Sequence, residues 1–132
     1  MTYLADTHIV VWWHLGSPEL PDPYRRLLEQ AEARGPRIGV SAISLWEIAK
    51  LHERGRLQLS ASLDQCLADV EGSPAFDVLP LTASIAAESL RLGPGYPRDP
   101  TDQLIGATAR CFGLQLLTVD RSIRASRAVA VA

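Results

Sequence analysis

The sequence contains few residues that crosslink small proteins or hold zinc. Only two of its 132 residues are cysteines, Cys66 and Cys111, and neither lies in a CxxC or Cys/His motif. This spacing argues against a disulfide framework and against a zinc site. We therefore expect two buried free thiols in a reducing compartment.

Long hydrophobic runs are also missing. The longest strongly apolar run is Ile9–Trp13, far shorter than the roughly 20 residues that span a bilayer. The first residues, MTYLADTH, place an acid inside the first apolar run and carry no basic segment before it. A signal peptide has the opposite pattern. We therefore expect a cytoplasmic protein with no membrane partner.

An excess of positive charge is absent as well. The formal net charge is −2 and the isoelectric point is about 5.9, which disfavours a protein that coats duplex nucleic acid. No GxxxxGK[ST] loop is present, so nucleoside triphosphate hydrolysis by that route is disfavoured. A carboxylate active site needs metal cations before a phosphate approaches, so a nucleic-acid substrate remains open.

What the sequence does have is an alternation of short apolar runs with helical patterns, in a composition typical of globular proteins. Strands are expected at Tyr3–Ala5, Arg37–Val40, Phe76–Leu79 and Leu114–Val119, with an edge strand considered at Val129–Val131. Helices are expected at Ile9–Leu15, Pro21–Arg34, Ser41–Arg54, Leu63–Val70, Thr82–Leu92 and Thr101–Phe112. This order predicts a single α/β domain over residues 1–132, with a mostly parallel central sheet flanked by helices.

Two aspartates follow predicted strands directly. Asp6 comes after Tyr3–Ala5, and Asp120 comes after Leu114–Val119. Ligands collect beyond the carboxyl ends of parallel strands, so both side chains are candidates for a site at that edge of the sheet. Each also suits a turn or a helix N-cap, which is the structural alternative.

An acid also lies inside the helix predicted at Ser41–Arg54. Glu47 sits among apolar residues in ISLWEIAKL, and the helical period predicts that it is partly buried. Burying a carboxylate costs several kcal/mol unless a cation or hydrogen bonds offset the cost. A bound metal would provide that offset. The alternative is a solvated glutamate paired with Lys50 or Arg54.

The stretch RDPTDQLIGATAR holds two aspartates three positions apart. Asp99 precedes Pro100, and proline favours the first helical position, so Asp99 is the natural N-cap. Asp102 falls at the third helical position, where an acid also suits the helix dipole. Because a capping carboxylate is largely occupied, Asp102 is the better candidate ligand. Gly106, one turn later, would permit close packing of the helix.

Together these observations give four acids from four separate segments: Asp6, Glu47, Asp102 and Asp120. Clustered carboxylate oxygens suit Mg²⁺ or Mn²⁺, and such ions support phosphoryl chemistry. A haloacid-dehalogenase-like phosphatase would need a second aspartate where His8 stands. A receiver-like signalling domain would need paired acids after the first strand and a lysine where Arg121 stands. The sequence therefore disfavours both alternatives.

The segments YLADTHIVVWW, VSAISLWEIAKL, RDPTDQLIGATAR and LQLLTVDRSI, in this order over about residues 3–123, resemble the PIN-domain ribonucleases. Within that family they are similar to the VapC-type toxins of toxin–antitoxin pairs. The resemblance implies three core acids, Asp6, Glu47 and Asp102, a more variable fourth acid, Asp120, and auxiliary roles for Asp99 and Thr118. It also implies an Mg²⁺- or Mn²⁺-dependent endonuclease that cleaves single-stranded or looped RNA and leaves a 5′-phosphate.

The same resemblance implies a homodimer and a small antitoxin, similar to VapB, that inserts into the acidic groove. Basic residues beside the acids are the candidates for holding the RNA backbone: Lys50, His52, Arg54, Arg98 and Arg121. Trp12, Trp13 and Trp46 are candidates for base stacking, although core or dimer-interface positions are the favoured interpretation. A housekeeping RNA-processing nuclease and a non-catalytic PIN-like binding module remain the alternatives.

Overall fold

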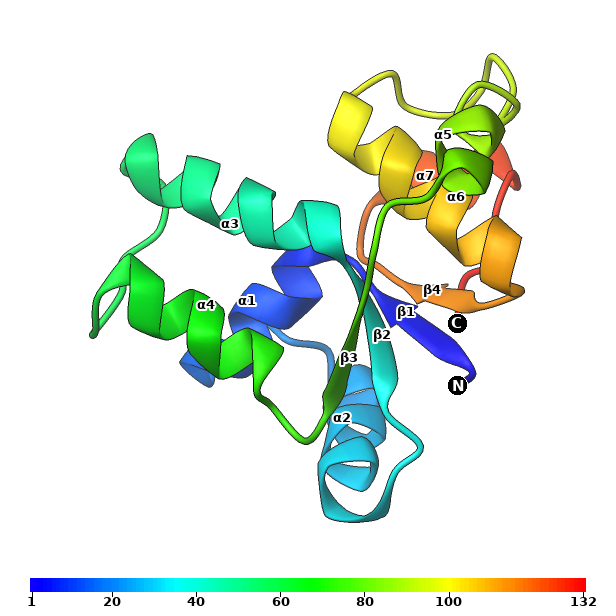
Figure 1. Cartoon of the computed structure of the whole chain (residues 1–132). Helices are drawn as coiled ribbons and strands as arrows, with labels where there is room; N and C mark the ends of the chain where they lie inside the picture. The colour runs from blue at the N-terminus through cyan, green and yellow to red at the C-terminus, as the bar shows by residue number, and fades with distance from the viewer.

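The computed structural model describes residues 1–132 as four strands and seven helices (Figure 1). The strands are β1 (Tyr3–Ala5), β2 (Ile38–Ser41), β3 (Phe76–Leu79) and β4 (Gln115–Leu117). The helices are α1 (Thr7–Leu15), α2 (Asp22–Arg34), α3 (Ala42–Glu53), α4 (Leu63–Glu71), α5 (Ala83–Glu88), α6 (Pro100–Phe112) and α7 (Arg121–Ser126).

The four strands form one sheet in the order β3-β2-β1-β4, and every neighbouring pair is parallel. Leu4 of β1 pairs with Gly39 of β2 on one side and with Leu116 of β4 on the other. Parallel neighbours require crossover connections, which the intervening helices provide. The predicted α/β fold with its helix-flanked sheet is confirmed, and the sheet is entirely rather than mostly parallel.

Helices cover both faces of the sheet, because the strands direct alternate side chains to opposite sides. Ala5, Val40 and Leu117 belong to the apolar cluster under α1 to α4. Leu4 and Leu116 belong to the cluster under α6 and α7. Figure 1 shows these two helical layers on either side of the strands. No helix combines the length and the apolar character that a membrane crossing requires.

Several predicted boundaries differ from the structure. The last strand is shorter than Leu114–Val119, because the chain leaves the sheet after Leu117 and then begins α7, which the sequence did not predict. The helix expected at Thr82–Leu92 ends at Glu88. The edge strand considered at Val129–Val131 is reduced to one bridge between Val131 and Leu116.

The expectation of two buried thiols was half wrong. Cys66 is buried in the cluster under α1 to α4, whereas Cys111 is exposed near the end of α6. Both are free thiols, as predicted.

Candidate active site

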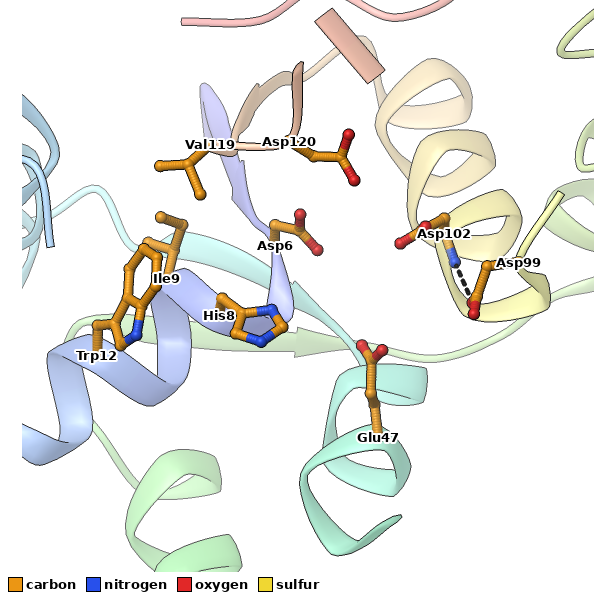
Figure 2. A pocket seen from close by; sticks show the side chains of 9 residues that line it. All are labelled: Asp6, His8, Ile9, Trp12, Glu47, Asp99, Asp102, Val119 and Asp120. Atoms are coloured by element: carbon orange, nitrogen blue, oxygen red, sulfur yellow. Dashed lines mark hydrogen bonds between the residues drawn. The ribbon is translucent and has the colours of Figure 1, made fainter. Parts of the chain in front are cut away.

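A pocket of about 360 Å³ opens beyond the carboxyl ends of β1 and β4 (Figure 2). It is lined by Asp6, His8, Ile9, Trp12, Glu47, Asp99, Asp102, Val119 and Asp120. The four acids predicted from the sequence are therefore brought to one place. Figure 2 shows the carboxylates of Asp6, Glu47 and Asp102 directed toward one another, with Asp120 above them.

Asp6 directly follows β1 and caps α1, so this helix begins at Thr7 rather than at Ile9 as predicted. Its Oδ1 accepts a hydrogen bond from the backbone N–H of Thr7 at 2.8 Å, and its Oδ2 accepts one from the hydroxyl of Thr118 at 2.7 Å. Burial raises the pKa of Asp6, and the charge of Glu47 raises it further, against the effect of these hydrogen bonds. The carboxylate is fixed in orientation and poorly solvated.

Asp102 lies in the first turn of α6, opposite Asp6 across the pocket (Figure 2). Burial is the largest cause that raises its pKa, and together with the negative charges of Asp6, Asp99, Glu47 and Asp120 it brings the pKa from 3.8 to about 7. Like-charge crowding of this kind is typical of sites that hold a cation or perform acid–base chemistry.

In the absence of metal, Asp102→Asn is expected to stabilise the protein at pH 8. The raised folded-state pKa means that wild-type stability falls as the pH rises from about 4 to about 7. The full shift corresponds to about 4 kcal/mol, but the side chain is only half-buried, so solvent screening reduces the expected gain to about 1–2 kcal/mol. Urea unfolding in EDTA at pH 8 and at pH 4 measures it. A gain that is equal at both pH values would contradict this electrostatic origin.

Asp99 is the N-cap of α6, as predicted. Its Oδ1 accepts the backbone N–H groups of Thr101 at 2.9 Å and of Asp102 at 3.3 Å. A hydrogen bond from the hydroxyl of Thr101 lowers the pKa of Asp99, and the backbone N–H groups lower it further. The cap is therefore charged at neutral pH, and it fixes the turn from which Asp102 projects.

Glu47 is held by a residue that sequence reasoning missed. The hydroxyl of Thr101, whose side chain is only 6% exposed, lies 3.1 Å from Oε2 of Glu47 and also contacts Oδ1 of Asp99. A hydroxyl has one proton, so it donates to one carboxylate at a time. The alternative pairing of Glu47 with Lys50 or Arg54 is not present: Lys50 pairs with Glu53, and Arg54 forms no salt bridge.

Asp120 serves both as a cap and as part of the pocket wall. Its Oδ1 accepts the backbone N–H groups of Ser122 at 2.8 Å and Ile123 at 3.1 Å, which starts α7. The helix N-cap considered as the structural alternative for Asp120 is therefore confirmed. Its second oxygen, Oδ2, remains available to the pocket. The hydroxyl of Thr118 links the two strand-end acids, because it also accepts the backbone N–H of Asp120 at 3.1 Å.

Two further contacts position the site without lining it. Thr7 and Ser44 form a buried hydroxyl pair at 2.9 Å that joins the starts of α1 and α3. Tyr96 donates from its phenol to the backbone carbonyl of Asp102 at 2.7 Å, and its ring packs on Gly106. The absence of a side chain at Gly106 therefore makes room for the ring of Tyr96 rather than for a neighbouring helix or strand. The only sequence signal for this contact was an aromatic residue in the loop before the helix.

The remaining predicted residues surround the acids. Lys50 and Arg54 line an adjoining groove of about 200 Å³, whereas Arg121 lines another pocket, which shares Val119 with the acidic one. Arg98 is exposed just before the cap. Trp12 lines the acidic pocket with its ring centroid 5.8 Å from that of His8.

The chemistry of the donor set fits a hard divalent cation. The polar side chains around the raised-pKa acids are dominated by carboxylate oxygens, which Mg²⁺ and Mn²⁺ prefer. The cluster has no thiol and one imidazole, so it is a poor zinc site. No three acidic or imidazole side chains converge tightly enough to chelate one ion in this arrangement, and the fit rests on donor type and on charge.

Comparisons with known proteins agree with this fold. The PIN domain family model matches residues 3–128. Ribonuclease VapC22 of Mycobacterium tuberculosis is 33% identical over 126 residues, which cover 96% of this chain and 92% of that protein.

Two solved structures share the fold over nearly the whole chain. The structure of VapBC2 from Rickettsia felis bound to a promoter DNA fragment has a TM-score of 0.72 at 18% identity, covering 100% of this chain and 98% of that one. A toxin–antitoxin complex from Klebsiella pneumoniae has a TM-score of 0.66 at 20% identity, covering 99% and 97%. The chain therefore belongs to the PIN-domain family and, within it, to the VapC group.

Proposed function

We propose that this protein is a metal-dependent endoribonuclease and the toxin of a toxin–antitoxin pair. The observation that carries the proposal is the meeting of Asp6, Glu47, Asp102 and Asp120, from four separate elements, in one pocket where burial and mutual repulsion raise the pKa of Asp102. The 33% identity to a protein named as a ribonuclease supports RNA as the substrate class.

Asp6 and Asp102 would hold the metal, with Glu47 ligating it or its water and Asp120 completing the set. When bound, Mg²⁺ or Mn²⁺ lowers the pKa of a water molecule and neutralises charge on the phosphodiester. The chain's own contribution is orientation: Thr118 fixes Asp6. The deprotonated carboxylate of Asp102 is the form that binds a cation, so metal binding competes with a proton at this side chain.

Other residues position these ligands and exclude water. Thr101 donates to Glu47 or to Asp99, which couples α3 to the first turn of α6. Ile9, Trp12 and Val119 form the apolar part of the pocket wall, and an apolar wall strengthens electrostatic interactions inside the pocket.

The proposed partners follow from the same pocket. A small antitoxin similar to VapB would place a basic side chain among the acids, where an Arg or Lys would relieve the repulsion between the carboxylates. The likeness to a toxin–antitoxin complex supports such a partner. A homodimer is part of the proposal and rests on the resemblance to VapC-type toxins alone.

A cleavage assay tests the proposed activity. Single-stranded RNA is expected to be cut in Mg²⁺ or Mn²⁺ and to remain intact in EDTA, because the carboxylates alone repel the phosphate backbone. Protein carrying Asp6→Asn, purified identically, controls for contaminating nuclease. Cleavage that persists in EDTA, or that is equal in the two preparations, would refute the assignment, and a folded wild type that binds RNA without cutting it would favour the non-catalytic alternative.

A further inference from the structure

A second groove adjoins the acidic pocket between α3 and the start of α6. It is lined by Trp46, Glu47, Lys50, Leu51, Arg54, Asp99, Pro100 and Thr101. Glu47 and Asp99 belong to both cavities. A linear ligand whose reacting bond lies at the acids therefore has a continuous path into this groove.

Trp46 is the unusual residue in the groove. It is 50% exposed, so it does not lie in the core; a dimer-interface position, the other one favoured from the sequence, would also leave it exposed in a single chain. The ammonium of Lys50 lies 5.6 Å from the centre of the indole ring, within the range of a cation–π contact. In proteins that bind single-stranded nucleic acids, bases stack on exposed aromatic rings and nearby cations contact the backbone.

The positive charges of the groove are available to a phosphate. Arg54 forms no salt bridge, and its charge reaches Asp99, whose pKa it helps to lower. Lys50 pairs only with the exposed Glu53, at 3.2 Å, and exposed pairs of this kind are weak enough to exchange. Lys50 lies on α3 four residues after Trp46, and Arg54 is the C-cap residue of the same helix.

We propose that this groove is a nucleotide subsite, in which Trp46 stacks one base of single-stranded RNA while Arg54 and Lys50 contact its phosphate. The proposal rests on the proposed ribonuclease function and extends it to a nucleotide flanking the cleaved bond. A second copy of the chain is the competing occupant of an exposed indole. The cation over the ring and a second cation, Arg54, in the same groove favour a polyanion over an apolar protein face.

Binding without cleavage tests the subsite. A labelled single-stranded RNA of about ten nucleotides is titrated in EDTA with protein carrying Asp102→Asn, which removes one repelling charge. Adding Trp46→Leu is expected to weaken binding about tenfold, because stacking one base contributes about 1–3 kcal/mol. Adding Trp46→Phe is expected to retain most of the affinity. Adding Arg54→Gln is expected to weaken binding. It is also expected to reduce the slope of log affinity against log salt concentration by about one, the value for one phosphate contact.

Phe112→Leu is the matched control, since Phe112 is 49% exposed and lies roughly 16 Å along α6 from Thr101. Equal affinities for Trp46→Leu and Phe112→Leu, or no RNA binding by the Asp102→Asn protein, would overturn the subsite. So would a Trp46→Leu protein that binds RNA normally but changes oligomeric state in light scattering. Failure of the proposed function is separate, because it is judged by wild-type cleavage in Mg²⁺.

Discussion

Asp102→Asn is expected to reduce RNA cleavage at saturating Mg²⁺ by about 100-fold or more, since even supporting residues of a metal site cost roughly 10–100-fold. The substitution keeps the shape of the side chain and removes its charge. It also leaves the backbone carbonyl that accepts the phenol of Tyr96. The measurement is the rate of single-turnover cleavage of a defined RNA, with folding checked by urea unfolding.

The same substitution should make the metal-free protein more stable at pH 8. A change that raises stability while removing activity separates a functional acid from a structural one, because functional sites hold charges that the fold alone would not keep together. Asp6→Asn should lose activity as well. Its effect on stability is expected to be less favourable, because the Asp6 carboxylate accepts hydrogen bonds from Thr7 and Thr118.

Asp99→Ala provides the contrast within the same helical turn. Removing the cap is expected to cost about 1 kcal/mol of stability, with cleavage kept within a few-fold when rates are compared at equal folded fractions. Asp64→Asn is the neutral control, because Asp64 is an exposed acid in the first turn of α4. If Asp99→Ala removed activity from folded protein while Asp102→Asn retained it, the assignment of cap and ligand would be reversed.

The division between Asp99 and Asp102 was predictable because it depends on local rules. Proline at the first helical position places the cap directly before it, and the helical period then places Asp102 one turn inside. The convergence of Asp6 with Asp120 was predictable for a related reason. Parallel strands end at one edge of a sheet, so residues that follow two such strands meet there.

The contacts that hold the acids in place were not predictable, because they join residues that are distant in sequence. Thr101 reaches Glu47 across 54 positions, and Thr118 reaches Asp6 across 112. No periodicity or spacing records such pairs. The helix α7 was missed for a local reason. Arg121–Ser126 is short and has little apolar pattern, so the cap formed by Asp120 is its clearest sequence signal.

Gly106→Ala is expected to lower the free energy of unfolding by about 2–3 kcal/mol, although alanine normally stabilises a helix interior by about 1 kcal/mol relative to glycine. A Cβ at residue 106 would lie 2.7 Å from Cζ of Tyr96 and 3.2 Å from its Cε1, and it would clash with the phenol oxygen. The tyrosine is 4% exposed and has little room to retreat. Overpacking of this kind typically costs about 1–3 kcal/mol, and displacing the ring also breaks the hydrogen bond to Asp102.

A double-mutant cycle separates the clash from the hydrogen bond. Tyr96→Phe keeps the ring and removes only the hydroxyl that bonds to Asp102, so it should cost about 1 kcal/mol. Tyr96→Leu removes the ring atoms that meet the new methyl group, so Gly106→Ala should cost far less in the Tyr96→Leu background than in the wild type. Because the ring anchors the turn that carries Asp102, we also expect Gly106→Ala protein to cleave RNA several-fold more slowly at equal folded fractions. A Gly106→Ala protein more stable than the wild type would show that Tyr96 moves aside freely and that its bond to Asp102 positions nothing.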